Sequence, residues 1–302
     1  MNPISILITG GTGFLGSALT RRLLAKQVVV TVFGRDAEKI RKQFGPGVGA
    51  ATRFADLADA GAFDAVVNLA GAGIFDRYWT GPRKQILRNS RIELTRELVA
   101  WIAAASKPPV LVSGSAIGVY GDQGDSVLSE TSPANADFAQ QLCADWEAAA
   151  LAAADHGSRV CLIRTGLVLG RGGGLLQRML PAFRLGLGGT LGDGRQWMSW
   201  IHLEDWLAAA EAMIADPAMS GAYNATAPEP ATNREFSQAL AEALGRPMLL
   251  PLPAGLLKLL LGEMSALVLG SQRVKPERLL AHGFQFQYSR LKPALDAILH
   301  TS

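Results

Sequence analysis

Cysteine is scarce in this chain, which has Cys143 and Cys161 as its two cysteines among 302 residues. Two cysteines form neither the disulfide framework of a small secreted domain nor a thiolate metal site. No metal is therefore expected, and a reducing, cytoplasmic location is the simplest expectation. The first residues, Met1-Asn2-Pro3, carry no basic side chain, so no secretory signal is expected either.

Charged residues are also few. Asp, Glu, Lys and Arg make up 18% of the chain, and the formal net charge is +3. The basic residues are dispersed, so no nucleic-acid partner is expected, whereas an anionic small ligand is compatible with this balance. Hydrophobic residues make up 49% of the chain, which is ample for a buried core. The expected partner is a small-molecule substrate.

No hydrophobic run predicts a membrane-spanning helix. The most apolar tract, residues 248–270, is interrupted by prolines, glycines and charged residues, and falls short of the roughly 20 apolar residues that a spanning helix needs. No membrane partner is therefore expected. We expect two short apolar helices between Leu249 and Leu269, whose leucines form either core or a subunit contact. The core is the favoured interpretation, and a homodimer remains open.

Glycine, in contrast, is concentrated near the N-terminus, in Thr9-Gly10-Gly11-Thr12-Gly13-Phe14-Leu15-Gly16. This stretch follows the apolar run Ile4-Ser5-Ile6-Leu7-Ile8 and opens an amphipathic segment. Gly10 suits a tight turn, Gly13 a close approach to a pyrophosphate, and Gly16 the packing of a helix on a strand. The stretch therefore predicts a dinucleotide-binding loop, with Gly10, Thr12, Gly13, Phe14, Leu15 and Gly16 along the cofactor.

Apolar runs alternate with helical segments through the first half of the chain, which is typical of an α/β fold with a doubly wound parallel (Rossmann) sheet. The expected strands are Ile4–Thr9, Val28–Phe33, Ala65–Leu69, Val110–Ser113 and Val160–Arg164, with a short one near Ala51–Phe54; the expected helices are Phe14–Lys26, Arg83–Ala105 and Ala134–Asp155. We expect residues 1–170, with 201–226 returning to them, to form the cofactor domain. Residues 171–200 and 227–302 form a smaller C-terminal substrate domain.

The end of the second expected strand favours NADP(H) over NAD(H). It reads Val32-Phe33-Gly34-Arg35, with no acidic residue before Asp36 to bind a ribose 2′-hydroxyl. Arg35, with Lys39 one turn further on, predicts a site for the 2′-phosphate. A solvated surface arginine is the alternative. Asp56 contacts the adenine amine in one interpretation and caps a turn in the other.

The later motifs resemble those of a known family. These are Asn68-Leu69-Ala70-Gly71, Ser113-Gly114-Ser115-Ala116-Ile117-Gly118-Val119-Tyr120-Gly121 and Trp200-Ile201-His202-Leu203-Glu204-Asp205. With the glycine loop, they resemble the extended short-chain dehydrogenase/reductases of the epimerase/dehydratase branch. An atypical subgroup, usually labelled sugar-nucleotide epimerases, has similar residues at 164–170 and 186–200. It ends in a C-terminal domain of unknown function, which Leu261-Gly262-Glu263-Met264, Pro276-Glu277-Arg278-Leu279-Leu280 and Gly283-Phe284-Gln285-Phe286 resemble. The resemblance implies cofactor contacts at Leu69, Ala70, Gly71, Ser113, Arg164 and Gly166.

The acid/base pair of that superfamily, Tyr-x-x-x-Lys, is missing here. The chain has four tyrosines, and none has a lysine four residues later. Alignment of Trp146-Glu147 with the family's helix places Ala139 and Cys143 where the tyrosine and lysine stand. A buried, inert thiol is the favoured interpretation of Cys143.

Three other residues are candidates for the chemistry. Ser115 occupies the position of the superfamily's catalytic Ser or Thr, although a strand-end serine bonded to backbone is equally compatible. Tyr120 follows in the same loop, as an acid, a pocket wall or a packing residue. Arg91 lies where relatives carry a structural asparagine. It either supplies a positive charge to the site or is an ordinary surface arginine.

The substrate side is expected between Gly170 and His202, with Gln196, Met198, Trp200 and His202 as candidates; His202 is either structural or part of the pocket. Met198 stands where epimerases that bind nucleotide-diphosphate sugars carry an arginine, so a smaller or more apolar ligand is favoured. We expect an NADP(H)-dependent oxidoreductase or epimerase acting on a small carbonyl or hydroxyl compound. The alternative is a non-catalytic NADPH-binding sensor or assembly partner, which the missing Tyr-x-x-x-Lys favours.

Overall fold

The computed structural model describes residues 4–249 and 251–300. Met1-Asn2-Pro3, where no secretory signal is expected, and Leu250, in the apolar tract, lie outside the described residues.

Seven parallel strands form one sheet in the order β11-β7-β5-β4-β1-β2-β3. The strands are β1 (Ser5–Thr9), β2 (Val29–Phe33), β3 (Gly49–Ala51), β4 (Ala65–Asn68), β5 (Val110–Ala116), β7 (Val160–Thr165) and β11 (Gly221–Ala225). The strand order reverses between β1 and β4, the switch point at which doubly wound sheets bind ligands. The predicted fold class is confirmed. β5 continues to Ala116, and β3 precedes the position expected for it.

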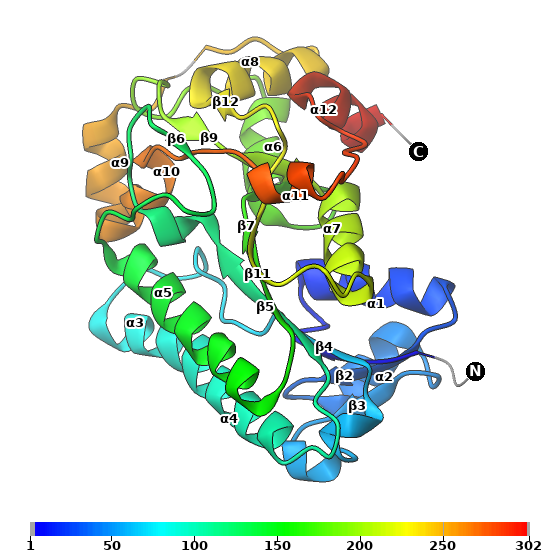
Figure 1. Cartoon of the computed structure of the whole chain (residues 1–302). Helices are drawn as coiled ribbons and strands as arrows, with labels where there is room; N and C mark the ends of the chain where they lie inside the picture. Colours follow the sequence, from blue (N-terminus) through cyan, green and yellow to red (C-terminus); the bar gives the residue numbers. More distant parts are fainter. Residues whose placement is uncertain (1–3, 250, 301–302) are drawn as a thin grey trace.

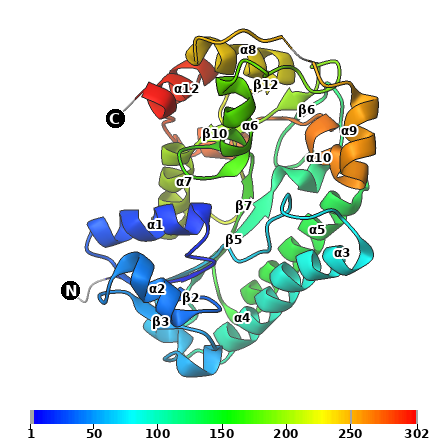
Figure 2. The same cartoon turned by 180° about the vertical axis from the view of Figure 1, so that it is seen from behind.

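Helices cover both faces of this sheet (Figures 1 and 2). On one face lie α1 (Phe14–Ala25), α2 (Ala37–Phe44) and α7 (Leu203–Ala215); on the other lie α4 (Leu94–Ala103) and α5 (Phe138–Leu151). Side chains alternate along each strand, so Ile6 and Ile8 pack in the first layer, which we call the main core, and Leu7 packs in the second. The apolar β-branched runs are buried on both sides, as expected for a parallel sheet.

A smaller lobe lies at one end of the sheet, at the top of Figure 1. It contains β8 (Leu167–Leu169), α6 (Gly174–Arg184), β9 (Trp197–Met198), β10 (Trp200–His202), β12 (Ala231–Thr232), α8 (Asn233–Ala243) and α12 (Leu291–His300). Its core includes Phe183, Trp200 and Phe236. A capping box begins α8, in which the side chains of Thr232 and Glu235 each accept from the backbone N–H of the other residue. The domain limits remain a prediction.

The long helix expected over residues 83–105 is interrupted in its middle. It consists of α3 (Gly81–Arg88), a π-helical turn η3 (Asn89–Glu93), and α4. Such turns are rare and occur frequently at functional sites. Here the turn presents Ser90 and Arg91 to the loop that follows β4.

Short elements complete the chain. The 3₁₀ turns are η1 (Phe54–Asp56), η2 (Ala60–Ala62), η4 (Ile117–Tyr120), η5 (Ala152–His156) and η6 (Gly262–Ser265). The strand β6 (Val127–Leu128) pairs with β13 (Arg273–Val274). The predicted pair of short apolar helices is present as α9 (Ala254–Leu261) and α10 (Ala266–Leu269).

The leucines of this region are only partly in the core. Leu257 is buried, but Leu259 is 82% exposed and Leu249 is 65% exposed. The expectation that the core accounts for this leucine excess is therefore wrong for the outward side of α9, which an eight-residue helix buries through a single residue. No helix of the described residues is both long and apolar enough to span a membrane.

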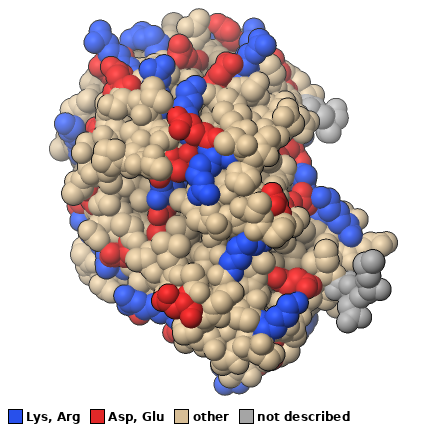
Figure 3. Space-filling model, viewed as in Figure 1, with Lys and Arg blue, Asp and Glu red and all other residues tan. Residues whose placement is uncertain are grey.

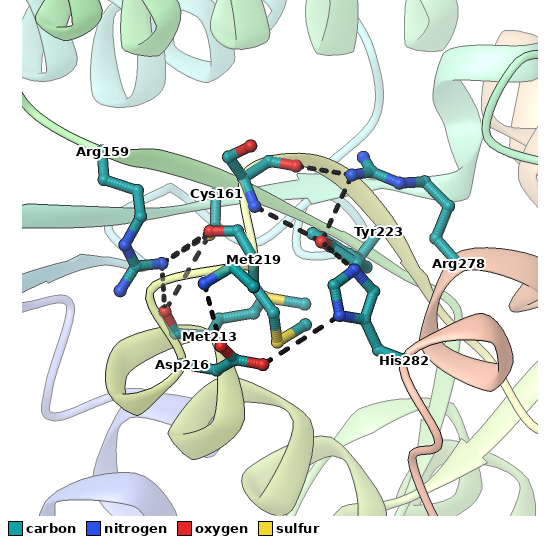
Figure 4. A network of polar contacts seen from close by, with 10 residues as sticks. Arg159, Cys161, Met213, Asp216, Met219, Tyr223, Arg278 and His282 are labelled. Atoms are coloured by element: carbon teal, nitrogen blue, oxygen red, sulfur yellow. Dashed lines mark hydrogen bonds and ion pairs between the residues drawn. The ribbon is translucent and has the colours of Figure 1, made fainter.

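The C-terminal segment returns to the sheet edge through α11 (Glu277–Ala281). Arg278 donates hydrogen bonds to the carbonyl oxygens of Ala222 and Ser220 and to the hydroxyl of Tyr223 (Figure 4). That hydroxyl lies 3.0 Å from Nε2 of His282. Leu279 is fully buried in the main core. Part of the C-terminal region is thereby an integral part of the sheet layer.

Candidate functional site

The glycine loop links β1 to α1 at the switch point of the sheet. Gly10 has a φ of +68°, and a Cβ on it would lie 2.6 Å from the carbonyl oxygen of Leu69. A Cβ on Gly16 would lie 2.3 Å from the oxygen of Gly10. Over Gly13, such a Cβ would meet the Gly10 oxygen at 3.3 Å and, apart from its neighbours in the chain, no other atom of the described residues within 4 Å. Space for a ligand therefore opens over Gly13, at the N-terminus of α1.

Two cations follow β2. Arg35 and Lys39 are both exposed, and in residues 4–249 and 251–300 neither has an ion-pair partner. Asp36, between them, caps α2 by accepting from the N–H of Lys39. Asp56 is engaged with Arg53 across 2.6 Å. Both interpretations of Asp56 remain predictions, whereas Arg35 and Lys39 have their charges free for an anion.

The ends of β1, β4 and β5 are joined by buried side chains. Oδ1 of Asn68 accepts from the Thr9 hydroxyl at 2.7 Å, and its Nδ2 donates to Thr95 at 2.8 Å and to Ser113 at 3.2 Å. The N–H of Ala70 donates to the Thr9 hydroxyl. These bonds hold the Leu69-Ala70-Gly71 loop against the glycine loop. The hydroxyl of Ser113 is bonded to Asn68, and Ser113 is fully buried.

Arg91 extends from the π-helical turn onto that loop. Its guanidinium lies so close to Gly71 that a Cβ there would be 2.9 Å from Cζ, and its Nη1 donates to the oxygens of Ala72 and Leu87. It also lies over the Trp146 ring, 5.4 Å from the centroid. Burial lowers the pKa of Arg91. In the described part of the chain, no carboxylate pairs with this charge.

A cavity of about 710 Å³ lies between the sheet and the smaller lobe. Its walls come from the end of β5, the start of α5, the strand β9 and the segment around α10; Gly166, Gln196 and Met198, among the predicted site residues, line it. The other predicted substrate residues, Arg91, Trp200 and His202, are not among its lining residues.

Ala139 and Cys143 line the same cavity from α5, one turn apart. A Cβ on Gly118 would lie 3.6 Å from the Ala139 Cβ and 3.5 Å from the Cys143 Sγ. Burial raises the pKa of Cys143 to about 12, against the opposing charge of Arg91. The thiol is therefore protonated near neutral pH and is not an activated nucleophile.

Ser115 is buried and turned toward α5. Its hydroxyl donates to Oε1 of Glu147 at 2.6 Å. Arg164, opposite Ser115 in the strand register, binds the same carboxylate through Nε at 2.8 Å and Nη2 at 2.9 Å. Burial disfavours the charge of Arg164, but its bonds to Glu147 outweigh this and raise the pKa of Arg164. The hydroxyl of Ser115 is thus bound to protein, and a ligand contact by Ser115 stays a prediction.

Tyr120 belongs to the same network. Its hydroxyl donates to Oδ1 of Asn224 at 2.6 Å and accepts from Nη1 of Arg164 at 3.0 Å. The side chain is 1% exposed, and burial raises its pKa in spite of Arg164. Neither Tyr120 nor Ser115 is among the lining residues of the cavity. The expected role of Tyr120 as an acid stays a prediction, with packing as the arrangement present here.

Of the predicted substrate residues, Gln196 and Met198 line the cavity, whereas Trp200 does not. Nε2 of Gln196 donates to the oxygens of Leu191 and Val268, and Met198 accepts a bond at Sδ from Asn233. Trp200 is fully buried and donates to the oxygen of Glu229.

His202 caps α7 by accepting from the N–H of Glu204 at 3.1 Å, and its ring centroid lies 3.9 Å from that of Tyr288. Burial lowers the pKa of His202 to about 4, so the imidazole is neutral.

Sequence reasoning missed Glu147 and Asn233. Glu147 is separated from Ser115 by 32 positions along the chain, and only its place in a helix of small apolar residues marks it as unusual. Asn233, fully buried, holds Leu191 and Met198 in the cavity wall. Asn233 directly follows Thr232, the N-cap residue of α8. A polar residue at the start of a helix is common, so the sequence gives no sign of its contact with Met198.

The crevice fits a dinucleotide. The Gly10 and Gly16 contacts leave no room for side chains, the helix N-terminus is open above Gly13, and two unpaired cations stand at the end of β2. On the face shown in Figure 3, acidic and basic side chains are interspersed with uncharged ones. The local cations at β2, rather than a broad basic surface, are what suit a phosphate group.

Comparisons with known proteins agree with this geometry. Residues 6–225 match the NAD dependent epimerase/dehydratase family, and residues 252–298 match a domain of unknown function, DUF1731. The epimerase family protein Mb2239 of Mycobacterium bovis is 43% identical over 294 residues, covering 96% of each protein.

Two further matches extend over the whole fold. The chloroplastic SDR39U1 homologue of Arabidopsis thaliana, an epimerase family protein, is 39% identical over 305 residues, covering 99% of this chain and 87% of the plant protein. The crystal structure of the human epimerase family protein SDR39U1 (isoform 2) with NADPH has a TM-score of 0.89 and 37% identity, covering 98% of this chain and 99% of the human one.

Proposed function

Because the chain belongs to the NAD dependent epimerase/dehydratase family, we propose that it is an NADP(H)-binding oxidoreductase or epimerase-like protein acting on a small carbonyl or hydroxyl compound. The observation that carries the proposal is the position of the cavity. It is lined by Ala139 and Cys143, the two positions where the family's acid and base stand, and it extends into the smaller lobe.

The cofactor is NADP(H). The turn at Gly10 and the open N-terminus of α1 above Gly13 would hold the pyrophosphate, and Arg35 with Lys39 would hold the 2′-phosphate. A human relative has been crystallised with NADPH, which supports this assignment. Arg91, between Gly71 and Cys143, would place a fixed positive charge where the cofactor crevice meets the cavity.

When bound, the cofactor supplies or accepts a hydride at its nicotinamide ring. The chain itself would position the reacting carbon and exclude water. Glu147 and Arg164 would hold Ser115 and the end of β5 in a fixed position beside the cavity. Because Ala139 carries no ionisable group and Cys143 stays protonated, the proton of the reaction would come from solvent or from the substrate.

The second candidate is binding without turnover, as a sensor of NADPH or an assembly partner. The lack of the family's acid/base pair supports this second candidate, since no ionisable side chain of ordinary pKa stands at the positions of Ala139 and Cys143.

Fluorescence titration with NADPH and NADH tests the cofactor. We expect NADPH to bind more tightly, and Arg35→Ala to weaken NADPH binding by about 10- to 100-fold while leaving NADH binding unchanged, because one charge-assisted contact is worth roughly 1.5–3 kcal/mol. Glu38→Ala, on the same exposed turn, is the control. Equal affinities for NADPH and NADH would count against the site.

Turnover is tested separately with NADPH carrying deuterium at the reactive carbon and a panel of carbonyl compounds. Transfer of deuterium to one compound selects the enzyme. Tight NADPH binding with no transfer to any member of a broad panel selects the binding protein.

A further inference from the structure

The cavity differs in chemistry from a site for nucleotide-diphosphate sugars. Its walls are mainly apolar, and its apolar lining residues include Ile74, Phe75, Leu167, Met198, and Leu267 and Leu269 of α10. At about 710 Å³ it has room for a ligand of moderate size. The size of the cavity therefore does not identify the substrate class, whereas the polarity and charge of its lining side chains do.

Most polar side chains of the wall are already engaged with the protein. Ser199 donates to the oxygen of Gln272 and accepts from the N–H of Val274. Asn233 uses its amide on Leu191 and Met198. They hold the wall together and have little capacity left for a polar ligand.

The charged residues of the cavity oppose a diphosphate. Asp122, Asp137 and Asp193 line it, against Lys258 as the one cation among its described lining residues. All three carboxylates are held in place, since Asp122 accepts from the N–H of Ser271, Asp193 accepts from the N–H of Arg195, and Asp137 caps α5. A diphosphate placed here would meet more negative than positive charge, with no arginine to bind it.

Two uncharged side chains of the wall keep an acceptor for a ligand. Nε2 of Gln196 donates to two carbonyl oxygens, which fixes the orientation of the amide. Its Oε1, like Oε1 of Gln272, has no hydrogen-bond partner within the described residues. Acceptors in a mainly apolar wall select a ligand that carries a hydroxyl group.

We infer that the cavity takes an uncharged compound with an aliphatic or aromatic body and a hydroxyl group, and that it rejects nucleotide-diphosphate sugars. The inference rests on the proposed function in so far as the cavity is the substrate site. It narrows the substrate class by charge and polarity.

Binding of 2-alkanols from 2-butanol to 2-octanol, measured by calorimetry with and without NADPH, tests the inference, with UDP-glucose as the charged probe. We expect affinity to rise about three- to fourfold for each added methylene group, the value for full apolar burial, and UDP-glucose not to bind. A flat alcohol series, or tighter binding of UDP-glucose, overturns the inference.

Two variants locate the binding. Met198→Arg and Leu267→Arg place a cation in the wall, and each should abolish the dependence on chain length. Leu259→Arg, on the exposed side of α9, is the matched control and should leave the series unchanged. Because Met198 is buried, the half-buried Leu267 keeps the test decisive if Met198→Arg does not fold. A series unchanged in Leu267→Arg overturns the inference.

The two proposals fail in different ways. Loss of NADPH binding with an intact alcohol series contradicts the cofactor assignment alone. NADPH binding with no alcohol binding contradicts the inference alone.

Discussion

Arg91 carries a charge that no carboxylate of the described chain neutralises, at the edge of the cofactor crevice. Replacement by methionine should therefore weaken NADPH binding by about 10- to 100-fold, the effect of losing a charge-assisted contact. The apo protein should unfold at nearly the same temperature, since the guanidinium bonds two backbone oxygens and contacts the Trp146 ring, and methionine also packs well on an aromatic ring. Fluorescence titration and thermal melting measure the two effects.

Arg91→Lys is the control for charge. It should restore part of the affinity, because lysine keeps the charge and loses the planar fork. Unchanged NADPH affinity in Arg91→Met would show that the guanidinium is structural.

His202 makes folding stability depend on pH. Its pKa is lowered by burial to about 4, from 6.5 in the unfolded chain. The neutral ring is therefore favoured in the folded state, and its contribution is complete above pH 6.5 and is lost as pH falls toward 4. Linkage gives a loss of about 2 kcal/mol between pH 7.5 and pH 5.

His202→Asn should remove this part of the pH dependence and keep an acceptor for the cap of α7. Urea unfolding of both proteins at pH 7.5 and pH 5 gives the difference. Parallel losses in the two proteins would mean that His202 does not titrate between these values.

The sequence predicts residue types and positions where the backbone geometry requires them. It does not predict the hydrogen-bond partners of the side chains. Gly10 and Gly16 follow from the motif because only glycine fits those contacts. Arg35 follows from its place after a strand. Ser115 was marked by its motif, but its partner Glu147 lies on a distant helix, and no local pattern tells whether a hydroxyl faces a ligand or a carboxylate.

At the level of elements, the loop before α6 is packed onto the loop before α1. A Cβ on Gly173 would lie 2.4 Å from Cγ of Phe14 and 2.8 Å from its Cβ, near the root of that side chain. The φ of Gly173 is −176°, an extended conformation that any residue adopts. The glycine is thus required by space, and the substrate lobe and the cofactor loop share this contact.

Gly173→Ala should shift Phe14 and destabilise the fold by about 1–3 kcal/mol, the usual cost of overpacking. NADPH affinity should fall with it, since Phe14 begins α1. In a chain that carries Phe14→Ala, Gly173→Ala should cost less of both quantities, because alanine lacks Cγ, the nearer of those two atoms. Urea unfolding and NADPH titration of the two single variants and the double variant measure the coupling. Additive effects would show that the two loops are independent.

Element boundaries were predicted well where apolar periodicity is strong, as in β1, β2 and α1. The π-helical turn at Asn89–Glu93 was not predicted, because an extra residue within a helix leaves the apolar periodicity of its two halves intact. The outward leucines of α9 were misassigned for a related reason. Composition records that a segment is apolar and does not record whether its neighbours cover it.

At the level of the whole molecule, five exposed leucines, which we call the leucine face, come from two segments: Leu187 from one, and Leu249, Leu252, Leu256 and Leu259 from the other. Backbone bonds from Leu249 to Gly188 and from Leu252 to Thr190 hold these segments together. Exposed apolar side chains on neighbouring segments commonly mark an interface. We predict a homodimer through this face.

Sedimentation velocity at micromolar concentration should show the dimer, and Leu259→Asp should shift it to the monomer. Leu280→Asp, at another exposed leucine on α11, is the control and should leave the dimer intact. A monomer at every concentration, or equal effects of the two variants, contradicts the prediction.

The return of α11 to the sheet has a consequence for biosynthesis. The edge strand β11 ends at Ala225, yet Leu279, which completes the main core beside it, is translated much later. A nascent chain that has not reached α11 presents an apolar sheet flank, and a Tyr223 hydroxyl without its contacts to Arg278 and His282, to solvent or to a chaperone. Residues that are synthesised late therefore complete the first layer that was built, and a product that ends before α11 carries an open flank that quality control can recognise.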